Sequence, residues 1–125
     1  MERKLIIPPG IDTTKMVIAP GVRVGDLLYV SGNAGLKDGK LVGADVESQA
    51  RQTMVNLGEV LKAAGLGWDR VAKVNCFLVY PERDFATWNK VWKEFFPKDP
   101  PARTTVGASI ALAGALIEVE LVAAF

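Results

Sequence analysis

Ile117-Glu118-Val119-Glu120-Leu121 alternates apolar and acidic side chains. This period of two is typical of a β-strand, because successive side chains point to opposite faces of a sheet. The stretch predicts a sheet with one apolar face and one face that carries Glu118 and Glu120. We expect the chain's own helices to cover the apolar face and another subunit to meet the acidic face around a polar site.

A second decisive stretch lies upstream, Pro100-Pro101-Ala102-Arg103-Thr104-Thr105-Val106. Proline fixes φ and lacks a backbone N–H, so the segment is extended and Arg103 becomes a positioned cation. Arg103 and Glu118, 15 residues apart, are therefore the candidate pair for a site. The same pair also fits a structural ion pair that ties together two strands or two subunits.

Two stretches predict amphipathic helices. Asp45 can cap the first helix and Gly65 can end it at C′, with apolar residues at helical spacing at Val46, Ala50, Met54, Leu57 and Leu61. The second helix ends before Pro97 and has an aromatic face. Such a face is more often core than a platform for a cofactor or a base; it comprises Phe85, Trp88, Trp92, Phe95 and Phe96.

The remaining apolar runs predict β-strands, bounded by glycine and proline turns. An N-terminal hairpin is expected from Leu5-Ile6-Ile7 and from residues 15–19; the other strands are expected within 27–31, 71–79, 104–109 and 116–125. The 27–31 strand is followed by Gly32-Asn33-Ala34-Gly35. This segment could form either the floor of a ligand-binding site or a plain loop. This order of elements predicts an α+β sandwich, a mixed β-sheet with two helices on one face.

Composition limits the possible chemistry. The 125 residues fit a single domain, 1–125, and no run approaches the length of a membrane span. The net charge is +1 and no basic cluster is present, so the composition argues against a nucleic-acid partner. The chain has no histidine, and its one cysteine, Cys76, is expected in the core, so catalysis must use carboxylates, Arg, Lys, Tyr, hydroxyls, backbone or water. The first residues lack a signal-peptide core, which predicts a cytoplasmic protein.

Further motifs run almost from end to end of the chain. They are Val24 to Gly32, Gln49-Ala50-Arg51-Gln52-Thr53, Asn56-Leu57, Leu61 to Gly65, Val74 to Leu78, Asp84-Phe85, Trp88-Asn89, Phe95-Phe96, Pro101-Ala102-Arg103-Thr104 and Ile117 to Glu120. In this order they resemble the reactive intermediate deaminase family, called RidA or YjgF, which is also labelled endoribonuclease L-PSP.

The resemblance implies a chorismate-mutase-like fold, a homotrimer with clefts between subunits, and no metal or organic cofactor. It implies hydrolysis of 2-imino or enamine acids to 2-oxo acids and ammonia, a form of metabolite damage control. Arg103 would bind the substrate carboxylate, and Glu118 would orient or activate the attacking water. The expected substrate contacts are Ile18, Gly32, Asn33, Asn89, Trp92 and Thr105.

Four positions depart from the pattern of this family. Active members often have tyrosine at Ile18, glutamine at Asn33, cysteine at Thr105 and glutamate at Gly107. Ile18 and Gly107 predict a less polar and roomier cleft, with weaker activity or a changed substrate preference. Two alternatives therefore stay open. One is a non-catalytic trimer that binds small carboxylates, and a weaker one is an endoribonuclease that inhibits translation.

Overall fold

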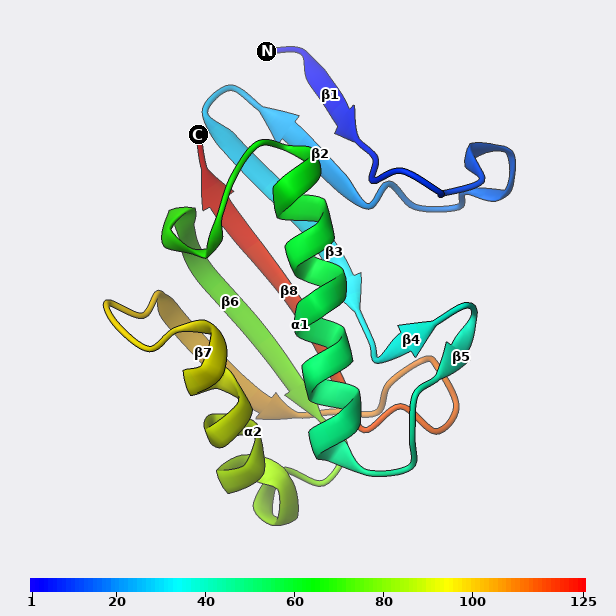
Figure 1. Ribbon diagram of the computed structural model, residues 1–125, viewed down its shortest axis with the longest axis vertical. Helices are drawn as coiled ribbons and strands as arrows, with labels where there is room; N and C mark the ends of the chain where they lie inside the picture. The colour runs from blue at the N-terminus through cyan, green and yellow to red at the C-terminus, as the bar shows by residue number, and fades with distance from the viewer.

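A mixed six-stranded sheet carries both helices on one face (Figure 1) in the computed structural model, which describes residues 1–125. The strand order is β1-β2-β3-β8-β6-β7, and only β6 and β7 pair in parallel. The strands are β1 Arg3–Ile6, β2 Gly21–Val24, β3 Leu27–Asn33, β6 Val71–Leu78, β7 Ala102–Gly107 and β8 Ile117–Ala124. A separate ribbon pairs β4 Leu36–Lys37 with β5 Lys40–Leu41, and the helices are α1 Val46–Ala63 and α2 Pro81–Phe95. The predicted α+β sandwich is confirmed.

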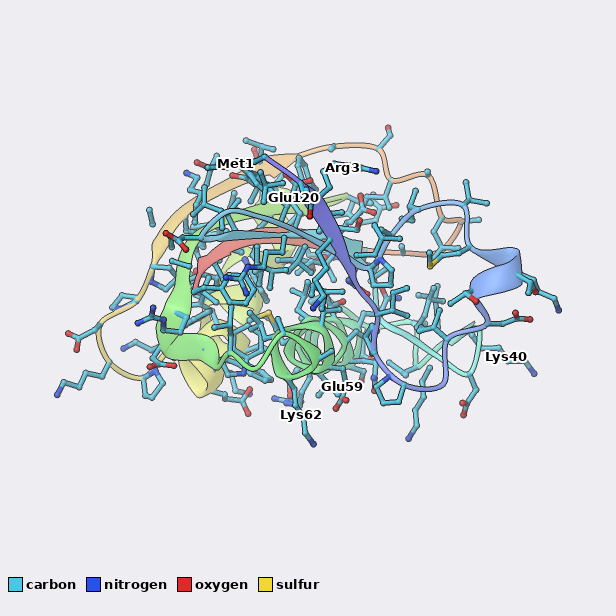
Figure 2. All side chains as sticks on the ribbon, turned by 90° about the horizontal axis from the view of Figure 1, so that it is seen from above. Met1, Arg3, Lys40, Glu59, Lys62 and Glu120 are labelled. Atoms are coloured by element: carbon cyan, nitrogen blue, oxygen red, sulfur yellow. The ribbon has the colours of Figure 1, made fainter.

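Strand β8 lies inside the sheet, antiparallel to both β3 and β6. Its alternation is realised as predicted: Ile117, Val119 and Leu121 are buried, whereas Glu118 and Glu120 are partly exposed. Figure 2 shows Glu120 on the side of the sheet opposite α1. The acidic positions of β8 therefore point away from the helices.

Helix α1 begins and ends where the sequence predicts. The Asp45 carboxylate accepts a hydrogen bond of 2.9 Å from the Ser48 amide, and Gly65 follows the helix with φ of 77°. Its inner face, including the fully buried Met54 and Leu57, packs into the core. Neither helix is long and apolar enough to cross a membrane.

The aromatic face of α2 is mostly core, as predicted, with Trp88, Trp92 and Phe96 buried. The prediction is wrong for Phe85, which is 44% exposed. Phe85 lies one turn from the start of α2, next to Arg103 of the edge strand β7. Because the sheet ends at β7, no further strand is present to cover this ring.

The predicted strand over residues 15–19 is wrong. A 3-10 turn occupies Thr13–Lys15, since the Asp12 carboxylate accepts a hydrogen bond of 3.0 Å from the Thr14 amide. The hairpin partner of β1 is instead β2, a few residues later. The apolar run within residues 15–19 misled the prediction, because local capping by Asp12 competes with strand pairing.

The buried side chain of Gln49 joins α1 to two loops. Its Nε2 donates to the carbonyls of Gly43 at 2.9 Å and Gly114 at 3.1 Å. Its Oε1 accepts from the Leu116 amide at 2.7 Å. Gln49 is 0% exposed, so these bonds satisfy its polar atoms and fix the loop that leads into β8.

Candidate functional site

Arg103 lies along one stripe of α2. Its Nη2 donates a hydrogen bond of 2.7 Å to Asn89 Oδ1, and its Cζ is 4.8 Å from the Trp92 ring centroid and 5.6 Å from that of Phe85. These three residues occupy successive turns of the helix, so they hold the guanidinium in one orientation. A guanidinium has five N–H donors, and Arg103 forms no ion pair within the chain. The remaining donors are the groups that a planar anion would use.

Two of the predicted substrate contacts therefore lie beside Arg103 as its supports. Trp92 is 8% exposed and stacks on the guanidinium, and the Asn89 amide oxygen is occupied by the Arg103 hydrogen bond. At Gly107, the space that was expected to be open is taken by Pro81, because a Cβ on Gly107 would lie 2.9 Å from Pro81 Cγ. The expectation of a roomier cleft at Gly107 is therefore wrong.

Thr105 pairs with Cys76 of β6 on the helix side of the sheet. The Thr105 hydroxyl is buried and has no hydrogen-bond partner. Burial raises the pKa of the Cys76 thiol, although the nearby Arg103 charge opposes this. Cys76 is 1% exposed and packs in the core, as predicted.

Glu118 lies on the opposite face, next to Gly32. A Cβ added to Gly32 would be 3.1 Å from Glu118 Oε1, so the carboxylate occupies the space that a side chain would need. The pairing of β3 with β8 is irregular between Val30 and Asn33, which places Gly32 in a bulge. No protein side chain forms an ion pair with Glu118. Its carboxylate is therefore free to bind water or a ligand.

A cavity of about 400 Å³ opens beside the same bulge. Ile18, Gly32 and Asn33 line it, and Ile18 is 64% exposed. Ser31 fixes the loop that carries Ile18, because its Oγ donates to the Ala19 carbonyl at 2.6 Å. The rest of the lining is mainly apolar or from α1: Pro8, Pro9, Ile11, Pro20, Ser31, Leu36, Asn56, Glu59 and Val60.

The predicted residues thus form two separate groups. Arg103 pairs with Val74, which is fully buried beneath the helices. Glu118 pairs with Phe77 of the same strand, and residues an odd number of positions apart on a strand face opposite sides. Arg103 and Glu118 therefore lie on opposite faces of one sheet. An ion pair between them within one chain is excluded, and a site that uses both needs two chains.

Sequence reasoning missed Phe85 and Ser31 as parts of the two groups. Phe85 was assigned to the core. Its position one turn before Asn89 could have indicated that it lies on the same stripe of the helix as Asn89. Ser31 precedes Gly32 directly, but its bond to the Ala19 carbonyl depends on tertiary structure. No three His, Cys, Asp or Glu side chains lie close enough together to share a metal ion.

A family model described as Endoribonuclease L-PSP matches residues 16–125. The chain belongs to this family. Among its curated relatives is the mitochondrial protein mmf2 of Schizosaccharomyces pombe, 43% identical over 106 residues, which are 82% of this chain and 83% of that protein. The 2-iminobutanoate/2-iminopropanoate deaminase of Mus musculus is 37% identical over 125 residues, covering 94% of this chain and 92% of that enzyme.

Solved structures agree with this assignment to the L-PSP family. The crystal structure of the YjgF gene product of E. coli has a TM-score of 0.86 and 30% sequence identity, covering 97% of this chain and 98% of that one. The resemblance to the RidA and YjgF proteins and to their fold is thus confirmed. Deaminase names among the relatives support an enzymatic role within this L-PSP family.

Proposed function

We propose that the protein is a cofactor-independent hydrolase of reactive 2-imino and enamine acids, which it converts to 2-oxo acids and ammonia. The observation that carries this proposal is the fixed guanidinium of Arg103, bonded to Asn89 and stacked on Trp92. A planar guanidinium binds a carboxylate through two parallel hydrogen bonds. The relatives named as 2-iminobutanoate/2-iminopropanoate deaminases support the reaction type.

In this proposal Arg103 binds the substrate carboxylate and holds the neighbouring C=N carbon in one position. Glu118 orients a water molecule and accepts its proton as the water oxygen bonds to that carbon. Glu118 passes this proton to the imine nitrogen, whose double bond to carbon has become single, and a carbinolamine results. The hydroxyl proton of the carbinolamine then moves to the nitrogen through Glu118 as the C–N bond breaks, so that ammonia leaves and the C=O bond forms. Because free imines already hydrolyse slowly in water, positioning and one general base are sufficient for useful acceleration.

The proposal places each site between two subunits of a homotrimer. It is supported by the opposite orientations of Arg103 and Glu118 in one chain. The face that carries Glu118 also leaves apolar side chains exposed, including Tyr29 at 49% and Leu27 at 40%. A second copy that covered this face would bury them and bring its own Arg103 to Glu118.

The test generates 2-iminobutanoate in place, from L-2-aminobutyrate with an L-amino-acid oxidase, and traps the remaining imine with semicarbazide. Wild type should lower the amount of trapped imine and speed ammonia release, whereas Arg103→Ala should abolish this effect. Loss of two charged hydrogen bonds corresponds to about 3 kcal/mol or more, a factor of over about 100 in kcat/KM. Arg3→Ala, at an exposed arginine of β1, is the matched control.

The outcomes separate the proposal from its alternatives. Acceleration that survives Arg103→Ala would refute the role of this residue. No acceleration by folded wild type, together with binding of 2-oxobutanoate that Arg103→Ala removes, would favour the carboxylate-binding trimer. This second function is favoured by Ile18, which contributes no hydroxyl to the cavity. RNA cleavage by the same preparation that withstands Arg103→Ala would indicate another site or a contaminating nuclease.

A further inference from the structure

We propose that the site selects imino acids with a bulky apolar side chain, branched or aromatic, and that Phe85 is the surface on which this side chain packs. The inference rests on the proposed function and adds its substrate class. It starts from one anomaly of α2: Trp88 and Trp92 of the aromatic face are buried, whereas Phe85 on the same face is 44% exposed. Exposing so large an apolar ring costs free energy unless a ligand or a partner covers it.

The position of Phe85 indicates that the group that covers its exposed ring is a ligand bound to Arg103. The Phe85 ring centroid is 5.6 Å from Arg103 Cζ, and Trp92 and Asn89 hold that guanidinium from the next turns of α2. A carboxylate bound to the free donors of Arg103 has its α-carbon one bond further on. The substituent of that carbon then lies within van der Waals reach of the exposed ring.

Pro81, four residues before Phe85 in α2, gives the wall beside Phe85 an apolar ring. Asp84 is 4% exposed and engaged by Arg83 at 2.8 and 3.0 Å, so its carboxylate is not available to a ligand. Gly107 has no side chain, and Pro81 fills the adjacent space with an apolar ring. An apolar side chain is therefore the substituent that this wall of the site matches.

The experiment measures kcat/KM for imines generated by an L-amino-acid oxidase from alanine, 2-aminobutyrate, leucine and phenylalanine. Wild type should prefer the leucine and phenylalanine imines by about tenfold, since one extra buried group is worth a factor of about 10–200. Phe85→Ala should remove this preference, so that kcat/KM falls about tenfold more for the leucine and phenylalanine imines than for the alanine imine, whereas Phe85→Leu should retain most of the preference. Val55→Ala, which truncates another 44% exposed side chain on α1, is the matched control and should change nothing.

A binding measurement keeps the inference independent of turnover. Calorimetry with pyruvate, 4-methyl-2-oxopentanoate and phenylpyruvate should show tighter binding of the two larger acids, lost in Phe85→Ala. If wild type hydrolyses only the small imines, or if Phe85→Ala weakens all four substrates equally, the inference is overturned while the proposed function stands. If no imine is hydrolysed, the proposed function fails, and the calorimetry alone decides whether Phe85 selects the side chain.

Discussion

Mixing two inactive variants tests whether each site is built from two chains. Arg103 and Glu118 occupy opposite faces of one sheet, so Arg103→Ala and Glu118→Gln should each be inactive alone. In a mixed assembly, a chain with intact Glu118 can lie next to a chain with intact Arg103. At each site, the chain that contributes Arg103 has this residue intact in half of the cases, and the same holds for the chain that contributes Glu118. Equal mixing should therefore restore about a quarter of wild-type activity.

The assay co-refolds the two variants from denaturant at equal concentration and measures hydrolysis of 2-iminobutanoate. Native mass spectrometry verifies that mixed assemblies have formed, and each variant refolded alone is the baseline. A third mixture, wild type with Arg103→Ala/Glu118→Gln, should also give about a quarter of wild-type activity by the same reasoning. Mixed assemblies that stay at the baseline, while the third mixture is active, would refute a site shared between chains.

Three further outcomes are expected. Gly32→Ala brings a Cβ to 3.1 Å from Glu118 Oε1 and should lower kcat by about tenfold with little change in Tm; an unchanged kcat would contradict the role of Glu118. Gly35→Ala places a Cβ 2.7 Å from the Gln49 backbone and should lower the free energy of unfolding by about 2 kcal/mol, measured in urea; unaltered stability would contradict this tight contact. Since burial raises the pKa of Cys76, its labelling by a thiol reagent at pH 8 should be over about 100-fold slower in the native protein than in denaturant, and rapid native labelling would contradict its burial.

The sequence predicted the elements whose signals are local. Asp45 and Gly65 marked the ends of α1 because capping and a positive φ depend on neighbouring residues alone. The alternation in β8 likewise revealed its two faces. Residues 15–19 were mistaken for a strand because the capping of Thr14 by Asp12 competes with the apolar pattern of those residues.

The site was harder to predict, because it depends on register between strands. Sequence spacing gave Arg103 and Glu118 as a pair, but both strands pair with β6, and that pairing decides which face each residue occupies. A shift of one residue in either register would reverse the result. The sequence therefore predicted the two residues as a pair, but their positions on opposite faces of one chain could not be read from it.

The hydrogen bonds of the Gln49 side chain also have a consequence for local opening of the chain. The Leu116 amide donates to a side chain of α1 rather than to a neighbouring strand, so it is released only when the Gln49 bond breaks. Gln49 is fully buried, and the inner face of its helix packs in the core. Local fraying at the surface therefore does not break this bond. Leu116 should therefore exchange its amide hydrogen with solvent as slowly as the core strands, although it lies outside the strand itself.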